Sequence, residues 1–236
     1  MKLPKKITPC PIIDTNIEIR FDSDLLSDAI FGVIYNSIKS EYPKVEKLPI
    51  LQLPDEIRFN DPNLISQPYY KLSNDTFVLQ IGPKMLSLGS NIEYIGWKKY
   101  YQKLTETFLV VKELKIIKQI IRLGIRYVNF FDFNIFEHVN LKITHNDTML
   151  KSERIMLSTE VVDAKFVNLL RIANRAYVSS IKKVGSVIDI DTHIAEPMEN
   201  FFDQMELLLQ QGHEAEKKLF FSLLKDEYLQ TLNPEY

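Results

Sequence analysis

Two acidic residues and a histidine recur at every second position late in the chain, as Asp189, Asp191 and His193. Side chains two positions apart on a β-strand point to the same face, about 6.5 to 7 Å apart. Carboxylate and imidazole groups arranged in this way could hold Mg²⁺ or Mn²⁺, or act as a general acid and base. The same alternation is typical of the solvated or ion-paired face of a half-buried strand, and we favour that interpretation.

Two arginines, Arg122 and Arg126, share one face of an earlier predicted strand, with Gly124 between them. Their planar guanidinium groups could grip a phosphate or a carboxylate in an anion pocket. Alternatively, each arginine pairs with an acidic side chain across the sheet, and the candidate partners are Glu18, Asp189 and Asp191. We favour ion pairing, and therefore expect Arg126→Ala to destabilise the fold.

RNA binding is a further possibility, because aromatic and basic residues occur together in two places. In the segment 97–103, the aromatic residues share a helical spacing that predicts burial in the core, with the lysines solvated. A second basic cluster consists of Arg171, Arg175, Lys182 and Lys183. The formal net charge of −2 does not favour a nucleic-acid partner.

The sequence carries no motif of a cofactor site or of an activated nucleophile. It has only seven glycines, and neither GxGxxG, GxxxxGK nor GxSxG occurs. His213 opens His-Glu-Ala-Glu-Lys, which is not the HExxH pattern of zinc proteases. We therefore expect no cofactor and favour a non-catalytic role, while an enzymatic activity stays open.

Hydrophobic spacing predicts the elements that must position these side chains. Residues 12–21 alternate between apolar and polar side chains, which predicts a half-buried strand. Helices are predicted at 25–38 and 97–111. Prolines interrupt 43–68, where we expect an edge strand at 46–53 and otherwise a surface loop. Further strands of this half are predicted at 69–72, 76–81, 85–88 and 120–131.

The rest of the chain predicts four strands and then a long helix. The strands are expected at 139–144, 155–162, 166–178 and 187–194. Pro197 is expected at the first helical position, before an apolar stripe that continues to Leu224. This order predicts an α+β fold, with antiparallel sheets, two helices in the N-terminal half and a long C-terminal helix. We expect residues 1–133 and 134–236 to form two halves packed as one compact unit.

Four short patterns together resemble one known group of proteins. They are Pro11-Ile12-Ile13, Tyr94-Ile95-Gly96-Trp97, Arg122-Leu123-Gly124-Ile125-Arg126-Tyr127-Val128-Asn129 and Ile188-Asp189-Ile190-Asp191. The chain resembles, over nearly its whole length, a sporadically distributed prokaryotic family of similar length that has no assigned function. This resemblance implies an accessory gene, of the kind found in defence and toxin–antitoxin modules, and it implies no catalytic residue.

Three classes of function are therefore open. The first is a non-catalytic macromolecule-binding module, such as an accessory or antitoxin-like component with a protein partner or a second copy of the chain. The alternatives are a metal-dependent hydrolase or nuclease that uses Asp189, Asp191 and His193, and an RNA-binding protein. We rank them in this order.

The sequence predicts no membrane insertion and no secretion. Its longest stretch without a charged residue is 29–38, whereas a helix needs about 20 apolar residues to cross a bilayer. The one cysteine, Cys10, cannot form an internal disulfide, which fits a reducing compartment. We expect a cytoplasmic protein.

Overall fold

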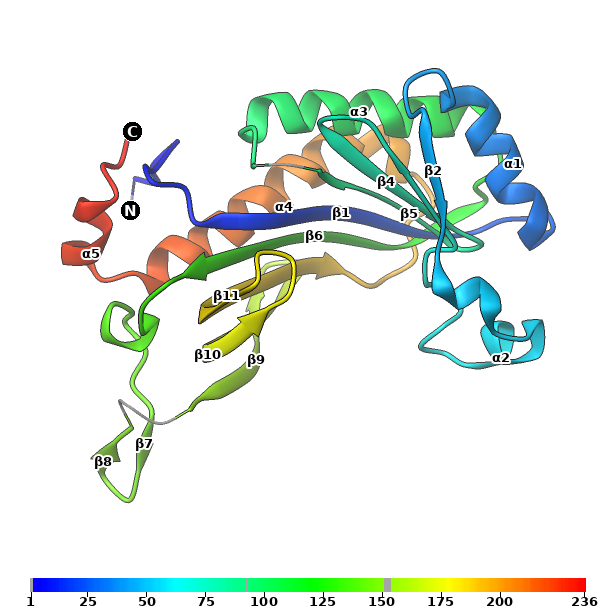
Figure 1. Cartoon of the computed structure of the whole chain (residues 1–236). Helices are drawn as coiled ribbons and strands as arrows, with labels where there is room; N and C mark the ends of the chain where they lie inside the picture. Colours follow the sequence, from blue (N-terminus) through cyan, green and yellow to red (C-terminus); the bar gives the residue numbers. More distant parts are fainter. Residues whose placement is uncertain (1, 92, 151–153) are drawn as a thin grey trace. The chain divides into compact units, whose positions relative to one another are not determined.

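A computed structural model describes residues 2–91, 93–150 and 154–236, and the chain divides into two compact units (Figure 1). We name them the terminal unit and the central unit. The terminal unit, which includes both chain ends, consists of Met1–Thr15, Arg126–His193 and Gln211–Tyr236. The central unit consists of Asn16–Ile125 and Ile194–Gln210. The two linear halves expected from the sequence remain a prediction.

The secondary structure confirms the predicted α+β class. The described chain is 37% strand and 31% helix, with five α-helices and a large antiparallel sheet. The long C-terminal helix is α4 (Phe201–Leu223), which is followed by the short α5 (Asp226–Thr231). None of the helices in the described ranges combines the length and the apolar character needed to span a membrane.

In the central unit the strands are arranged in the order β2-β3-β4-β5-β1-β6. Their bounds are β1 (Ile12–Asp22), β2 (Lys44–Lys47), β3 (Tyr70–Ser73), β4 (Phe77–Gly82), β5 (Met85–Ser90) and β6 (Gln119–Phe131). The first residues of β1 and the last residues of β6 belong to the terminal unit. The strands predicted at 69–72, 76–81 and 85–88 are present as β3, β4 and β5, which pair antiparallel in sequence order.

Alternation along β1 produces the two faces that the sequence predicts. Ile17, Ile19 and Phe21 are fully buried, whereas Glu18 and Arg20 between them are only partly buried. Burial of one face and partial solvation of the other is what period-two alternation produces in an antiparallel sheet. The buried face anchors the core, and the polar face carries the ion pairs described below.

Two helices cover the apolar side of this sheet. They are α1 (Ser27–Ile38) and α3 (Trp97–Glu113), and Figure 1 shows both over the strands β2 to β5. The ring of Phe31 in α1 stacks on Tyr70 of β3, and Phe77 of β4 stacks on Tyr100 of α3. Stacked rings of this kind add to the hydrophobic energy of helix–sheet packing.

In the terminal unit the strand order is β6-β11-β10-β9, with β9 (Met156–Asp163), β10 (Phe166–Val178) and β11 (Lys183–Ile194). Its core joins apolar residues of these strands to the ends of α4 and α5, among them Ile172, Ile190, Phe221 and Leu229. The chain ends lie side by side in Figure 1, because backbone hydrogen bonds join residues 5–8 to residues 232–235.

The strand predicted at 139–144 was wrong except for its last residue, which begins the two-residue β7 (Thr144–His145), paired antiparallel with β8 (Thr148–Met149). The chain instead forms a short 3-10 helix, Ile135–Glu137, and then a single bridge between Val139 and Leu224. Val139 is buried in the terminal core, and the side-chain amide of Asn140 donates to the carbonyl oxygens of Ser222 and Leu224. These contacts tie the segment to the end of α4 and take the place of a strand ladder.

Two further boundaries differ from the predictions. The strand expected at 46–53 is β2, which ends at Lys47 because Pro49 starts a 3-10 helix, Pro49–Gln52. The short α2 (Asp55–Asn60) then follows within the expected loop. Proline is tolerated at the start of a helix, which is where Pro49 lies in the 3-10 helix and Pro54 lies before α2. The last long helix begins at Phe201, four residues after Pro197, since Met198 forms a bridge with Ile120 and keeps the chain extended there.

Candidate functional site

Asp189 and Arg126 form a two-pronged ion pair in the terminal unit. The Nε and one terminal nitrogen of Arg126 donate to the two oxygens of Asp189, each at 2.8 Å. Arg171, opposite Asp189 in the β10–β11 register, donates to the same carboxylate at 3.4 Å. Parallel guanidinium–carboxylate bonds are the strongest type of ion pair, so the buried carboxylate is fully engaged. The pairing expected for Arg126 is therefore present.

The electrostatics of this cluster follow from that pairing. Hydrogen bonding to Asp189 raises the pKa of Arg126, which is charged at any physiological pH. Desolvation by the surrounding protein raises the pKa of nearby Asp14, and the positive charge of Arg126 partly offsets this effect. The cluster thus offers a structural anchor, with its central carboxylate occupied.

Asp191 and His193 continue along β11 without joining Asp189 in a ligand set. The Nδ1 of His193 lies 3.2 Å from the backbone oxygen of Asp191. Within residues 2–91, 93–150 and 154–236, no group of three His, Cys, Asp or Glu side chains is arranged to hold a metal ion. The geometry therefore brings Asp189 together with two arginines and does not assemble the metal site that Asp189, Asp191 and His193 could have formed.

Arg122 makes the equivalent pair in the central unit. Its guanidinium donates to Oε1 of Glu18 at 3.0 Å, and the Nε of Arg20 donates to the same oxygen at 2.6 Å. A Cβ at Gly124 would collide with the guanidinium of Arg122, so this glycine leaves room for the side chain to lie across the strand. The two arginines are engaged by different carboxylates.

The aromatic residues of α3 are buried or partly buried and pack within the protein. Tyr100 is fully buried, and its hydroxyl donates to the carbonyl oxygen of Leu88. Trp97 donates from its indole nitrogen to Gln210 at 3.0 Å. These rings are therefore occupied in packing, in agreement with the interpretation that we favoured for 97–103.

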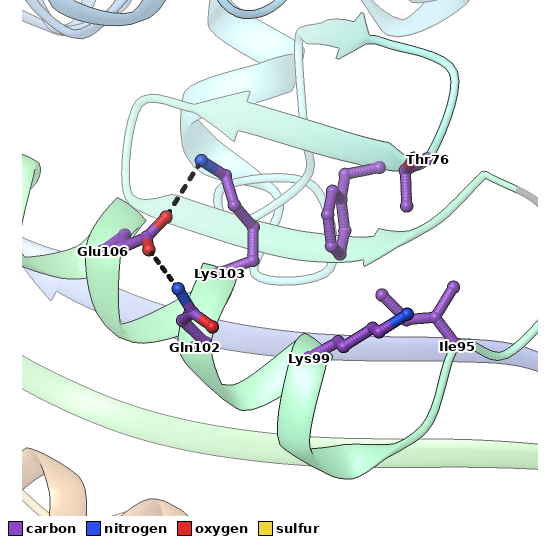
Figure 2. Close-up of a pocket in the computed structure, with 7 residues that line it drawn as sticks. Thr76, Ile95, Lys99, Gln102, Lys103 and Glu106 are labelled. Carbon is purple, nitrogen blue, oxygen red and sulfur yellow. Dashed lines mark hydrogen bonds and ion pairs between the residues drawn. The ribbon is translucent and has the colours of Figure 1, made fainter.

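A shallow hollow of about 390 Å³ lies between α3 and β4, shown in Figure 2. Phe77 and Ile95 supply its apolar lining, and its polar lining consists of Thr76, Lys99, Gln102, Lys103 and Glu106. Lys103 pairs with Glu41 and Glu106, while the amide of Gln102 also donates to Glu106. Most of its polar groups satisfy one another, so the hollow offers few groups for a ligand.

The end of the β10–β11 hairpin differs from the sites described above, because its side chains are exposed. We name residues Arg175 to Val184 the hairpin tip. The tip lies at the end of the yellow hairpin in Figure 1. Tyr177 is 65% exposed and Val184 is 61% exposed, and they stand opposite each other in the strand register. A tyrosine and a valine paired in solvent are not explained by packing within the chain.

Positive charge surrounds these two apolar residues. From Ala164 to Ile188 the sequence has five basic residues and no acidic one. Arg175, Lys182 and Lys183 are exposed, and in the described part of the chain none of them makes an ion pair or side-chain hydrogen bond. The sequence analysis identified this basic cluster. The exposure of Tyr177 could not be predicted in the same way, because it depends on how far the hairpin extends beyond the core.

A β-bulge fixes the shape of the tip. The β10–β11 register shifts between Ala173 and Ala176, so that β10 carries one extra residue, and Arg175 has a φ of 51°. The side chain of Asn174 accepts from the backbone N–H of Ile155 at 2.8 Å, which anchors the bulge. A bulge re-aims the side chains around it, and here it leaves Arg175 exposed.

A buried polar cluster lies on the helix-covered side of the terminal unit. The hydroxyl of Tyr127 lies 3.3 Å from Nδ1 of His213, and burial lowers the pKa of His213 to about 3. Glu216, one turn further along α4, has a pKa raised to about 8 by burial. Among the described residues, Glu216 makes no ion pair or hydrogen bond. This cluster could not be predicted from the sequence, because helical spacing alone does not show which polar residue is buried.

Comparison of the sequence with known protein families and with curated proteins gave no match.

Proposed function

We propose that this protein is a non-catalytic protein-binding module whose hairpin tip binds an acidic surface of a partner protein. The observation that carries the proposal is the exposed pair Tyr177 and Val184 within three basic side chains that have no described partner. Tyrosine and arginine are enriched at the centres of protein interfaces, where they supply most of the binding energy. Basic residues around them favour a negatively charged partner and speed its association.

Contacts within the chain fix the conformation of the hairpin tip in the absence of a partner. Asn174 anchors the bulge, and a Cβ at Gly185 would collide with the backbone of Phe131 and the ring of Phe130. The hairpin therefore approaches β6 closely where β11 begins. Because a preformed surface loses little conformational entropy on binding, it binds more tightly than a flexible loop.

The alternatives fit these residues less well. A hydrolase needs a carboxylate that is free to act, whereas Asp189 is engaged by Arg126 and Arg171. Single-stranded RNA is bound on several aromatic rings that stack successive bases, and the tip has one exposed ring, Tyr177. A protein-binding module also suits the accessory or antitoxin-like role that the family resemblance implies.

The test is purification of the tagged full chain from its native host after nuclease treatment. We compare the wild type with a tip variant that combines Tyr177→Ala, Lys182→Glu and Lys183→Glu. The matched control is Lys98→Glu with Lys99→Glu, which makes the same charge change at two exposed lysines of α3.

We expect the wild type and the α3 control to retain a stoichiometric acidic protein that the tip variant loses. All three chains should show the same melting temperature, because every altered side chain is exposed. Retention of the partner by the tip variant would overturn the proposal. So would recovery of nucleic acid alone, in a purification without nuclease, which would favour the RNA-binding alternative.

A further inference from the structure

We propose that strand β9 pairs antiparallel with β9 of a second copy of this chain, with Thr159 on the two-fold axis. This inference concerns a different surface from the hairpin tip and does not depend on the proposed function. It begins from the position of β9 at the end of the strand order, where β10 is its one strand neighbour among the described residues. The backbone N–H and C=O groups on its outer side are therefore available for another strand.

The side chains of β9 do not protect this edge. Met156 is 76% exposed and Val162 is 71% exposed, and the strand contains neither proline nor lysine. Its two charged residues are Glu160 and Asp163, and Asp163 is paired with Lys218. Natural sheets discourage pairing at an edge with short strands, lysine or proline. An eight-residue edge strand with exposed apolar side chains near both ends lacks these features.

The opposite behaviour is found at β2, the edge strand of the central unit. This strand has four residues, Lys44-Val45-Glu46-Lys47, and three of them are charged. Such an edge resists the addition of a further strand. Three of the four residues of β2 are charged, whereas β9 exposes apolar side chains near both of its ends, so β9 is the edge expected to be covered.

The sequence of β9 is complementary to itself in one antiparallel register. With Thr159 opposite Thr159 of the second copy, Met156 stands opposite Val162 and Leu157 stands opposite Val161. In the same register Ser158 stands opposite Glu160, so that the serine hydroxyl can donate to the carboxylate. Apolar, hydroxyl and Ser–carboxylate pairs of this kind each stabilise an antiparallel ladder.

Neighbouring registers with the same faces aligned are poorer. Moving the axis to Glu160 places two carboxylates directly opposite each other and sets Ser158 against Val162. Moving the axis to Ser158 sets Met156 against Glu160. Because directly opposite residues share a face of the sheet, the apolar pattern selects the register centred on Thr159.

This geometry makes the dimer testable by crosslinking at single positions. In a chain with Cys10→Ser, we introduce Thr159→Cys and treat the full-length protein with a short bis-maleimide. The matched control is Met156→Cys, because the two Met156 positions of the dimer are separated by six residues, roughly 20 Å along the strand. A second control, Val45→Cys, places the thiol on the charged edge strand β2.

We expect Thr159→Cys to give a covalent dimer and both control variants to remain uncrosslinked. Wild-type protein should have the mass of a dimer by light scattering, and Val162→Lys should shift it to a monomer, whereas Val45→Lys should not. A monomer mass for the wild type over the whole concentration range would overturn the proposal. Equal crosslinking of Thr159→Cys and Met156→Cys would overturn the proposed register.

Discussion

The middle of the β10–β11 hairpin, where Asp189 faces β6, and the hairpin tip carry similar basic residues in different surroundings. Near the middle of the sheet, Arg126 and Arg171 share the carboxylate of Asp189. At the tip, Arg175 and Lys182 are exposed and have no partner among the described residues. Charge alone therefore does not identify a binding surface, since a charge that is already paired within the fold interacts only weakly with a partner.

Glu216 represents a third kind of charged residue, because it is buried and lacks an ion pair in the described structure. A paired charge anchors the fold, an exposed unpaired charge is available for binding, and a buried unpaired carboxyl group stays protonated. The following variants separate these three circumstances.

The largest effect is expected for Glu216→Gln at pH 8. Burial raises the pKa of Glu216 from 4.5 to about 8. Below pH 4.5 the carboxyl is protonated in both the folded and the unfolded chain, whereas above it only the unfolded chain ionises, so stability is lost as the pH rises towards 8. By linkage, Glu216→Gln should raise the free energy of unfolding by on the order of 3 kcal/mol at pH 8 and leave it nearly unchanged at pH 4.

Urea denaturation at the two pH values measures this difference. Glu214→Gln is the matched control, since Glu214 is exposed on the same helix. An equal effect of Glu216→Gln at pH 4 and pH 8 would show that the carboxyl group does not titrate in this way.

The next effect is expected for Arg126→Ala. Removing the guanidinium leaves buried Asp189 with only the longer contact to Arg171. The cost should be about 2 kcal/mol, below the range for a fully buried pair, because the side chain of Arg126 is half-exposed. Arg175→Ala should cost less than about 0.5 kcal/mol, as expected for a surface substitution. Chemical denaturation measures both losses of unfolding free energy. Equal losses would show that the paired and the unpaired arginine contribute equally to stability.

A smaller energetic effect is expected for Tyr177→Ala, and it should change the affinity for the partner protein. Loss of a central aromatic contact should weaken partner binding about tenfold or more, which corresponds to roughly 1.4 kcal/mol. The melting temperature should stay the same, because Tyr177 is mostly exposed. Titration of the protein retained in the purification described above measures the affinity. A lower melting temperature with unchanged affinity would assign Tyr177 to the fold.

The smallest effect is expected for Gly124→Ala. The added methyl group meets the far end of the Arg122 side chain, which can swing aside. The cost should be about 0.5 kcal/mol, because Glu18 keeps its shorter hydrogen bond to Arg20 when the contact with Arg122 is lost. Comparison of this variant with Arg122→Ala by thermal denaturation checks the assignment, since their losses should be similar.

The fold class could be predicted from the sequence because alternation and helical spacing are local signals. Both are strong in residues 12–21 and 97–111, and the corresponding strand and helix are present. The segment 139–144 failed for a different reason. Val139 is buried against the end of α4, more than eighty residues later in the chain, and a contact of that separation leaves no local pattern.

The candidate site was only partly predictable. Period-two alternation placed Asp189 and Arg126 on strand faces, and the expected cross-strand pair followed from their opposite charges. The exposure of Tyr177 could not be predicted, since it depends on how far the hairpin reaches beyond the core. Asn174 gave no signal either, because an asparagine that anchors a bulge looks like any other polar residue in a strand.

Two variants of the same sheet test whether the hairpin tip is the binding surface: Lys182→Glu with Lys183→Glu at the tip, and Arg126→Ala in the Asp189 cluster. For each we would measure the melting temperature and the amount of co-purifying partner protein. We expect the tip variant to lose the partner at an unchanged melting temperature. We expect Arg126→Ala to lower the melting temperature but to retain the partner at temperatures where it is folded. Loss of the partner by Arg126→Ala, with retention by the tip variant, would instead identify the Asp189 cluster as the binding site.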